Sequence, residues 1–287
     1  MPRWVTDLRI AQALRDATTQ LAQVSDTARL DAEVLMAVVL GVSRSDLLLR
    51  HMAADVPGGF AELVARRMTQ EPVAYITGEQ EFYGRPFRVN RDVLIPRGDS
   101  EAIVEAALAA APTPRRVLDC GTGSGALLLT VLAERPEAHG VGIDRSEGAL
   151  AVAQDNAVRL GLADRALMLR RDWDEQGWAE GLTQFDLILA NPPYVEENAD
   201  ISQSVRGFEP GGALFAGPAG LDAYRVLLPQ LVPVLADKGI AVVEIGAAQA
   251  DLVGAIARNA GFDVQLTRDL GGRPRALTLR FGLGKAE

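Results

Sequence analysis

The tetrapeptide Asn191-Pro192-Pro193-Tyr194 combines residue types that could orient a planar amide for reaction. The carboxamide oxygen of Asn191 and a backbone carbonyl, that of Pro192, could each accept one N–H of an NH₂ group. The two prolines fix φ, and Pro193 biases Pro192 toward an extended conformation, so this carbonyl would be held in place beforehand. Tyr194 offers a flat aromatic face to a planar group. The tetrapeptide therefore predicts a site that holds an NH₂ with its nitrogen lone pair facing a reactive partner.

An amide nitrogen is a poor nucleophile, because its lone pair is delocalised into the carbonyl group. Methyl transfer from a sulfonium donor to such a nitrogen is the chemistry that needs this arrangement, and orientation for in-line attack can contribute about 7–11 kcal/mol. No dedicated strong base is required, which suits a chain with two histidines. An exocyclic amine of a nucleic-acid base poses the same problem, so the tetrapeptide alone leaves the substrate class open.

A glycine-rich loop at residues 119–125 follows an apolar strand and opens a helix, and such a loop lets a ligand approach the backbone closely. Asp144 comes about 20 residues later, at the end of the next predicted strand, where a carboxylate can accept hydrogen bonds from ribose hydroxyls. Asp172 and Trp173 follow the third strand and suit an adenine, the ring by stacking and the carboxylate by accepting from the amino group. The residues expected to bind a nucleotide cofactor are Gly121, Thr122, Gly123, Ser124, Gly125, Asp144, Asp172, Trp173 and Asn191.

The loop by itself also fits the dinucleotide fingerprint, through Gly121, Gly123 and Ala126, so a dehydrogenase must be considered. An NAD-dependent dehydrogenase would give the tetrapeptide no role, which favours a methyltransferase. The histidines and the single cysteine, Cys120, form no cluster with metal-ligand spacing, and we expect no metal. Cys120 is interpreted as a small buried residue and not as a nucleophile.

The charge and composition of the chain mainly exclude some classes of partner and some cellular compartments. The chain has 29 basic and 38 acidic residues, a net charge of −9, which argues against a broad nucleic-acid-binding surface. Residues 1–4 lack the apolar run of a signal peptide, and no stretch approaches the roughly 18 uncharged apolar residues of a membrane span. One cysteine agrees with a reducing compartment. We therefore expect a cytoplasmic protein without a membrane partner.

Apolar residues at helical spacing predict four short helices within about the first 75 residues, the first of them containing Leu8 and Leu14. Asp26 is a candidate N-cap of the second helix and Gly41 its stop. The fourth helix should end before Pro72. Aromatic-rich pieces on either side of a Gly-Arg-Pro sequence predict a β-hairpin over residues 81–89.

Strands and helices alternate from about residue 98 onward. This alternation predicts a mainly parallel sheet with helices on both faces and right-handed crossovers. The predicted strands are residues 116–119, 140–144, 166–170, 185–190, 239–245, 263–267 and 276–281. The predicted helices are residues 101–110, 126–134, 147–160, 220–236 and 248–260.

Taken together, these motifs resemble the HemK/PrmC family, whose members methylate a glutamine at N5 in bacterial peptide chain release factors. The likeness covers nearly the whole chain and is strongest over Glu71–Arg97, where Glu71–Gly78 and Val93–Arg97 match the family's linker signature. It continues through Asp119–Gly125, Asp144, Phe185–Tyr194, Glu209-Pro210, Gly220-Leu221, Tyr224-Arg225 and Glu244-Ile245-Gly246.

The resemblance implies a Rossmann-like class I methyltransferase fold, with S-adenosyl-L-methionine as the cofactor and a seven-stranded mixed sheet. Its domains would be a helical substrate-recognition domain (1–78), a β-hairpin linker (79–97) and the methyltransferase domain (98–287). By position, Gly121, Thr122, Gly123 and Gly125 would line the methionine end of the cofactor, Asp144 the ribose and Trp173 the adenine. The tetrapeptide 191–194 would bind the acceptor amide. The implied partner is a release factor, whose Gly-Gly-Gln loop the helical domain would help to present to a monomeric enzyme.

One segment departs from the family. After Ile95-Pro96-Arg97 the family usually continues Pro-Glu-Thr-Glu, whereas this chain has Gly98-Asp99-Ser100-Glu101, and Gly98 frees the turn. Arg97 remains a candidate contact near the mouth of the active site.

Three alternatives stay open. A paralogous group methylates a glutamine of a large-subunit ribosomal protein, but it usually has Ser-Pro after the Pro-Arg and a second cysteine in the glycine loop, and this chain has neither. A nucleic-acid adenine-N6 methyltransferase would share the tetrapeptide, but the acidic balance opposes it. A non-catalytic binding protein would leave the filled active-site positions without a purpose.

Overall fold

The computed structural model describes residues 9–281, which divide into two compact units. A helical unit comprises residues 9–79 and 201–208, and a sheet unit comprises residues 80–200 and 209–281. Leu8 and residues 1–4, which entered the sequence predictions, lie outside the described residues. No helix within residues 9–281 is both long enough and apolar enough to cross a bilayer.

The helical unit is built from short helices around an apolar core. They are α1 (Ile10–Leu21), α2 (Ala28–Leu40), α3 (Arg44–Asp46), the π-helical turn η1 (Leu47–His51), α4 (Phe60–Met68), α5 (Val73–Thr77) and α9 (Gln203–Phe208). Gly41 ends α2 in the left-handed region with φ 67°, as predicted. Helix α4 ends before Pro72, also as predicted, but Pro72 then serves as the N-cap of α5, a helix that the spacing of apolar residues did not indicate.

The predicted N-cap of α2 is wrong. The N-cap is Thr27 and not Asp26, and its side chain makes no capping hydrogen bond. The carboxylate of Asp31, in the first turn, instead accepts hydrogen bonds from the hydroxyls of Ser25 (2.7 Å) and Thr27 (2.8 Å). The start of this helix is therefore anchored from a residue inside it, an arrangement that sequence spacing alone does not distinguish from a capping aspartate.

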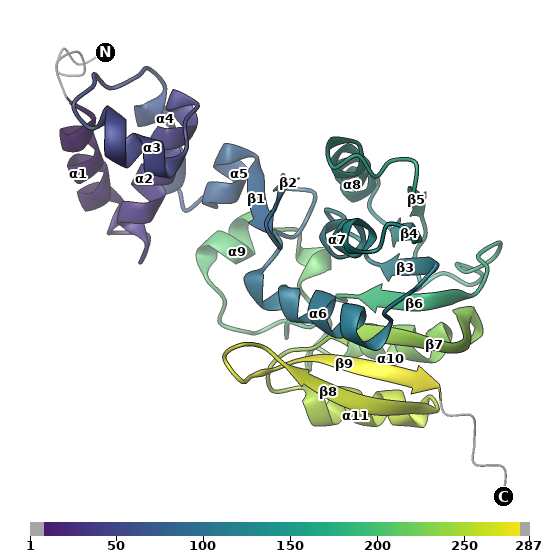
Figure 1. The fold of residues 1–287 in the computed structure, drawn as a ribbon. Coiled ribbons are helices and arrows are strands. Elements are labelled where there is room, and N and C mark those ends of the chain that lie inside the picture. Colours follow the sequence, from purple (N-terminus) through teal and green to yellow (C-terminus); the bar gives the residue numbers. More distant parts are fainter. Residues whose placement is uncertain (1–8, 282–287) are drawn as a thin grey trace, which may run out of the picture. The chain divides into compact units, whose positions relative to one another are not determined.

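The sheet unit contains the predicted seven-stranded mixed sheet (Figure 1). Its strands are β3 (Arg116–Cys120), β4 (His139–Asp144), β5 (Ala166–Arg170), β6 (Phe185–Ala190), β7 (Leu235–Glu244), β8 (Phe262–Arg268) and β9 (Pro274–Phe281). Their order is β5-β4-β3-β6-β7-β9-β8, with parallel pairing from β5 to β7 and antiparallel pairing at β9 and β8. The predicted class I methyltransferase fold is confirmed.

Helices cover both faces of this sheet, because its central strands are apolar on both sides. They are α6 (Glu101–Ala110), α7 (Ala126–Glu134), α8 (Glu147–Arg159), α10 (Asp222–Leu231) and α11 (Ala250–Asn259), with 3₁₀ turns η2 (Gly98–Ser100), η3 (Gly211–Ala213) and η4 (Val232–Val234). Val117 and Leu187 belong to the core beneath α6 and α7, whereas Leu118 and Ile188 belong to the core beneath α10 and α11. The two pairs of helices lie on opposite faces of the sheet (Figure 1). The alternation along each strand thus builds two apolar cores, one on each face.

One predicted helix is shorter than expected. The spacing of apolar residues predicted a helix over 220–236, but α10 spans Asp222–Leu231 and β7 already begins at Leu235. Gly220 has φ 63°, which helical residues do not adopt, and Pro233 lies within the 3₁₀ turn that separates α10 from β7.

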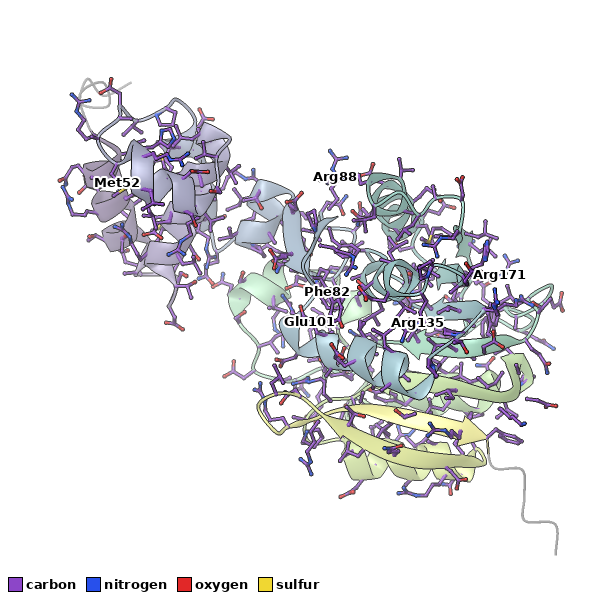
Figure 2. All side chains as sticks on the ribbon, viewed as in Figure 1. Met52, Phe82, Arg88, Glu101, Arg135 and Arg171 are labelled. Atoms are coloured by element: carbon purple, nitrogen blue, oxygen red, sulfur yellow. The ribbon has the colours of Figure 1, made fainter. Side chains whose placement is uncertain are left out.

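The predicted hairpin consists of β1 (Glu79–Phe82) and β2 (Arg85–Arg88), joined by Tyr83 and Gly84, both with positive φ. Phe82, labelled in Figure 2, packs edge-on against Phe87 in the core beneath α6 and α7. The carboxamide of Asn156, in α8, accepts from the Arg88 N–H (2.7 Å) and donates to the carbonyls of Arg88 (3.0 Å) and Ser124 (2.9 Å). The hairpin is therefore fastened to the same helix that supports the glycine loop.

Candidate active site

Strand pairing brings the predicted site residues to one edge of the sheet. Cys120, at the end of β3, pairs with Ala190 at the end of β6, so the glycine loop and the tetrapeptide leave the sheet side by side. Cys120 also pairs with Ile143, which puts Asp144 next to the loop. The strand order reverses between β3 and β6, and in open α/β sheets ligands bind in the crevice at such a reversal.

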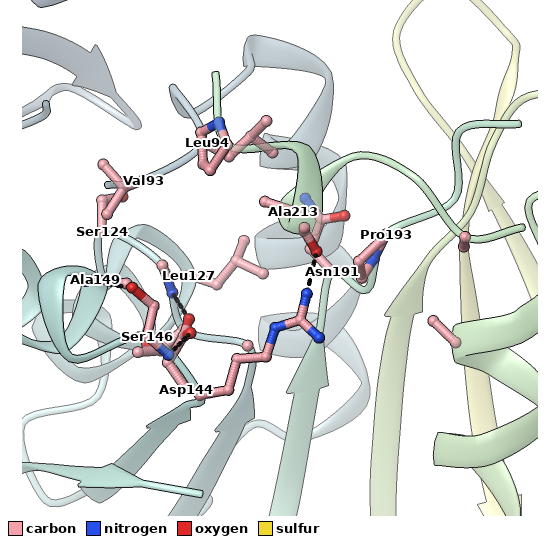
Figure 3. A pocket seen from close by; sticks show the side chains of 18 of the residues that line it. Val93, Leu94, Ser124, Leu127, Asp144, Ser146, Ala149, Asn191, Pro193 and Ala213 are labelled. Atoms are coloured by element: carbon pink, nitrogen blue, oxygen red, sulfur yellow. Dashed lines mark hydrogen bonds between the residues drawn. The ribbon is translucent and has the colours of Figure 1, made fainter. Parts of the chain in front are cut away.

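A pocket of about 410 Å³ occupies this crevice, entirely within the sheet unit. The predicted residues that line it are Gly121, Thr122, Gly123, Ser124, Asp144, Asp172, Trp173, Asn191 and Pro193. The predicted Gly125, Pro192 and Tyr194 do not contribute to the lining. Figure 3 shows Asp144 and Ser146 on one side of the pocket and Asn191 and Pro193 on the other.

The glycine loop turns through left-handed backbone conformations, with φ of 76°, 54° and 81° at Gly121, Gly123 and Gly125. The backbone N–H groups of Gly121 and Thr122 both donate to the carbonyl of Ile143 at 2.9 Å, which ties the loop to β4. A Cβ added to Gly121 would lie 3.0 Å from the ring of Trp173. The absence of a side chain at residue 121 therefore lets the indole lie directly against the loop.

The carboxylate of Asp144 is fixed by two backbone groups. Oδ2 accepts from the Gly123 N–H at 3.0 Å and Oδ1 from the Ser146 N–H at 2.9 Å. Because each carboxylate oxygen has two lone pairs, both retain capacity for a hydroxyl donor in the pocket. The carboxylate is therefore held in place and can still accept hydroxyl donors, and its role at a ribose stays a prediction.

Asp119, the first residue of the 119–125 segment, is a buried acid for which no chemical role was predicted. Its Oδ2 accepts from the Thr122 hydroxyl at 2.7 Å, beneath the pocket lining. Burial raises the pKa of this carboxyl to about 7, although the hydroxyl of Thr122 acts in the opposite direction. Burial likewise raises the pKa of the neighbouring Cys120 thiol well above its usual range, which agrees with its interpretation as an unreactive core residue.

Gln230, in α10, holds the segment that carries Trp173. Its Nε2 donates to the Trp173 carbonyl at 3.0 Å, and its Oε1 accepts from the Trp178 indole N–H at 2.7 Å. Trp178 is buried, whereas Trp173 is half-buried and has a face on the pocket. One indole thus anchors the segment and the other remains available to a ligand.

Asn191 lines the pocket, and its carboxamide makes no hydrogen bond to any residue in the described range 9–281. Tyr194 behaves differently, because its hydroxyl donates to Oε1 of Glu244 at 3.1 Å. Burial raises the pKa of Tyr194, and the nearby Glu244 carboxylate raises it further. The tetrapeptide therefore presents a free amide at its first residue and is anchored at its last.

Glu244 ends β7 and is buried. Burial raises the pKa of its carboxyl to about 7, opposed by the Ser100 hydroxyl, Arg275 and Tyr194. The resemblance included Glu244 as part of a motif, but no chemical role was predicted for it. An acid at the last position of an apolar strand, as Asp144 is, or next to it, as Asp119 is, is the sequence signal that could have identified Glu244.

The segment that departs from the family lies beside the pocket. Arg97 lines the pocket and forms an ion pair with the buried carboxylate of Glu209, which also accepts from the Ile95 N–H at 3.1 Å. Asp99 does not line the pocket and instead accepts from Arg275 of β9 at 2.8 Å. Gly98 starts the short turn η2 without a positive φ. The turn at residues 98–100, where the sequence departs from the family, is therefore held by the ion pairs of Arg97 and Asp99.

Arg145 reaches across the pocket from the end of β4. Its Nη2 donates to the Gly212 carbonyl in η3 at 3.1 Å, and both residues line the pocket. This contact connects the Asp144 side of the pocket to the segment above Asn191. Arg145 could not be predicted from the sequence, because nothing near it in the chain indicates a contact 67 residues away.

Two family models match this chain: residues 12–78 match the PrmC N-terminal domain, and residues 99–215 match the methyltransferase small domain. A release factor glutamine methyltransferase of Cereibacter sphaeroides is 41% identical over 281 residues, covering 95% of this chain and 99% of the relative. One of Caulobacter vibrioides is 40% identical over 260 residues, covering 88% of this chain and 89% of the relative.

Solved structures are similar at the level of the fold. An O-methyltransferase family protein of Burkholderia thailandensis matches with a TM-score of 0.53 at 14% identity, covering 93% of this chain and 98% of that one. A methyltransferase of Pyrococcus furiosus matches with a TM-score of 0.51, also at 14% identity, covering 78% of this chain and all of that one. At such identities the likeness concerns the fold alone.

Proposed function

Since the chain belongs to the family of release factor glutamine methyltransferases, we propose that it methylates the side-chain nitrogen N5 of the glutamine in the Gly-Gly-Gln motif of a peptide chain release factor. The enzyme uses S-adenosylmethionine and methylates a glutamine of release factors. The observation that carries the finer proposal is the free carboxamide of Asn191, which lines the pocket beside the glycine loop.

The pocket fits S-adenosylmethionine in size and in chemistry. A volume of about 410 Å³ lies within the range of cofactor pockets. We assign Asp144 to the ribose hydroxyls, Trp173 and Asp172 to the adenine, and the loop 121–125 to the methionine end. The bound cofactor supplies an electrophilic methyl group on a positively charged sulfur.

Asn191 and Pro192 are assigned to the acceptor amide. The Asn191 oxygen accepts one N–H of the glutamine NH₂ and the Pro192 carbonyl accepts the other. Holding both N–H groups fixes the direction of the nitrogen lone pair, which amide resonance otherwise leaves weakly nucleophilic. Tyr194 offers its aromatic face to the planar amide, and its bond to Glu244 restricts where that face can lie.

Residues 1–78 are proposed as the domain that recognises the release factor, residues 79–97 as the linker and residues 98–287 as the methyltransferase domain. The match of residues 12–78 to the PrmC N-terminal domain supports a role shared with the relatives. We further propose that the enzyme acts as a monomer without binding nucleic acid directly, in keeping with its net charge of −9.

The proposal is tested by transfer of a labelled methyl group to purified release factor, compared with a release factor whose Gly-Gly-Gln glutamine is replaced by asparagine. Label on the first protein and none on the second supports the target residue, and mass spectrometry of the labelled peptide locates the methyl group on N5. If both proteins are labelled equally, the assignment of the motif is wrong. Labelling of a ribosomal protein or of nucleic acid in its place would refute the substrate and leave the cofactor unaffected.

A further inference from the structure

Gln249 binds the backbone immediately after the acceptor-binding residues. It lies in the turn between β7 and α11, and its Nε2 donates to the carbonyls of Tyr194 and Gly220, both at 3.1 Å. Its Oε1 accepts from the Gly246 N–H at 3.0 Å. The whole carboxamide is thus used to join three separate backbone segments.

Residues 244–249 consequently hold Tyr194 both at its side-chain hydroxyl and at its backbone carbonyl. Glu244, the last residue of β7, accepts from its hydroxyl, and Gln249, five residues later, donates to its carbonyl. The other end of the tetrapeptide is fixed by β6, whose Ala190 is paired in the sheet with Cys120 and Val243. Asn191 and Pro192 therefore lie between two anchored points.

The backbone segments around Gln249 are packed closely. Gly220 has φ 63°, and a Cβ at this position would overlap the Tyr194 carbonyl oxygen and lie 2.9 Å from Nε2 of Gln249. Gln249 is half-buried and does not line the pocket. It can therefore influence a substrate only through the residues it holds.

We infer that Gln249 is a positioning residue for the methyl acceptor, because it fixes the carbonyl end of the turn whose Asn191 and Pro192 oxygens receive the glutamine NH₂. This inference rests on the proposed function of the tetrapeptide. Two hydrogen bonds to carbonyl groups in a crowded site are costly to lose, since the carbonyls are then left without donors or the turn must move to reach water. Either change displaces acceptors whose effect depends on orientation.

Gln230 provides a matched comparison on the other side of the pocket. It also bridges a backbone carbonyl and a second partner, but it holds Trp173 on the proposed cofactor side. The same chemical change at the two glutamines should therefore separate acceptor positioning from cofactor binding. Gln265, exposed on β8 and away from the pocket lining, serves as the neutral control.

The experiment uses the full-length enzyme with purified release factor and the variants Gln249→Met, Gln230→Met and Gln265→Met. For Gln249→Met we expect kcat to fall at least ~10-fold while the cofactor Kd, measured by calorimetry, stays within about twofold. For Gln230→Met the cofactor Kd should rise, and Gln265→Met should match the wild type in both quantities.

The variant Gln249→Glu adds a second measurement, the pH dependence of kcat, which a purely structural role of Gln249 would leave unchanged. An ionised carboxylate would face two carbonyl oxygens and repel them, whereas a protonated carboxyl can donate to one of them. We expect the kcat of Gln249→Glu relative to wild type to rise at least ~3-fold between pH 8 and pH 6, and that of Gln249→Met to stay flat.

Asn191→Ala in the same assay distinguishes failure of this inference from failure of the proposed function. If Asn191→Ala is impaired but Gln249→Met keeps its kcat, or if Gln249→Met loses kcat and cofactor affinity in proportion, Gln249 is not a positioning residue. If Asn191→Ala turns over normally, the acceptor assignment fails and the role of Gln249 fails with it. A loss of kcat in both variants, with cofactor affinity retained, supports the inference.

Discussion

At the residue scale, Asn191 and Asp144 line the same pocket but differ in how many hydrogen bonds their side chains make within the protein. Both oxygens of Asp144 accept backbone N–H groups, from Gly123 and Ser146, which hold the carboxylate in one orientation before any ligand binds. The Asn191 carboxamide has no partner within residues 9–281, so its oxygen is available to a substrate donor. This difference agrees with the proposed roles of Asp144 at the cofactor and of Asn191 at the methyl acceptor.

Replacing Asn191 by alanine should leave cofactor affinity within a few-fold and slow methyl transfer at least ~10²-fold, a loss of about 2.7 kcal/mol in the barrier. The reason is that this oxygen is proposed to hold the acceptor nitrogen, whereas most of the proposed cofactor contacts come from other residues. Calorimetry and single-turnover kinetics check the two halves of the prediction. Normal transfer by the variant would contradict the orienting role.

Asp144→Ala should instead weaken cofactor binding, by about tenfold or more, because the N–H groups of Gly123 in the loop and of Ser146 before α8 lose their acceptor, together with the proposed ribose contact. Asp237→Ala, which removes an exposed carboxylate at the start of β7, is the matched control. Calorimetric titration with S-adenosylmethionine measures both variants. Unchanged affinity in Asp144→Ala would remove this residue from the cofactor site.

At the element scale, two loops of the site, one before α10 and one after β6, approach so closely that no Cβ atom fits between them. Gly220, before α10, lies against the turn that follows β6, and its φ of 63° belongs to the left-handed region. Gly98, in the segment that departs from the family, has neither a positive φ nor any atom within 4 Å of an added Cβ. Backbone conformation and close packing therefore require glycine at position 220, whereas neither requires it at position 98.

Gly220→Ala should lower the free energy of unfolding by at least ~2 kcal/mol and impair methyl transfer, because the new Cβ displaces the Tyr194 carbonyl and the backbone is strained. Gly98→Ala should change stability by less than ~1 kcal/mol, in the stabilising direction, because it only restricts the unfolded chain. Chemical denaturation measures both variants. Equal effects would show that the packing around Tyr194 is looser than described.

At the scale of the whole molecule, two acids near the carboxyl ends of β3 and β7 are buried beside the pocket. Burial raises the pKa of both Asp119 and Glu244 to about 7, so each folded carboxyl keeps its proton to a higher pH than it does in the unfolded chain. Between their ordinary pKa values and about 7 the folded state binds more protons than the unfolded state. Stability from these groups is therefore complete at low pH and is lost as pH rises through this window.

Glu244→Gln removes one of these titrations while keeping an oxygen that can accept from Tyr194. A pKa raised from 4.5 to about 7 corresponds to about 3 kcal/mol of lost stability at high pH. Relative to wild type, the variant should thus gain stability at pH 8 compared with pH 5. Urea denaturation at the two pH values measures the difference, and a pH-independent offset would contradict the assignment.

Much of the fold and of the site's location followed from the sequence. Alternating strands and helices require a mainly parallel sheet, and such a sheet brings the carboxyl ends of β3, β4 and β6 to one edge. The glycine loop, Asp144 and the tetrapeptide each follow one of those ends, so their convergence could be predicted without coordinates. The ends of helices and strands were predicted less accurately where prolines and residues with positive φ interrupt the pattern, as between α10 and β7.

Only the tertiary structure decided which side chains face the pocket and which hold the others. Tyr194 belongs to the tetrapeptide in sequence, but its hydroxyl is bound by Glu244, 50 residues away. Asp99 is bound by Arg275, 176 residues away, and Gln249 reaches the turn after β6 from the turn after β7. Sequence periodicity reports which face of an element is buried, because burial depends on residue type. It does not report these partners, because a polar contact between distant segments depends on loop paths and rotamers that packing alone settles.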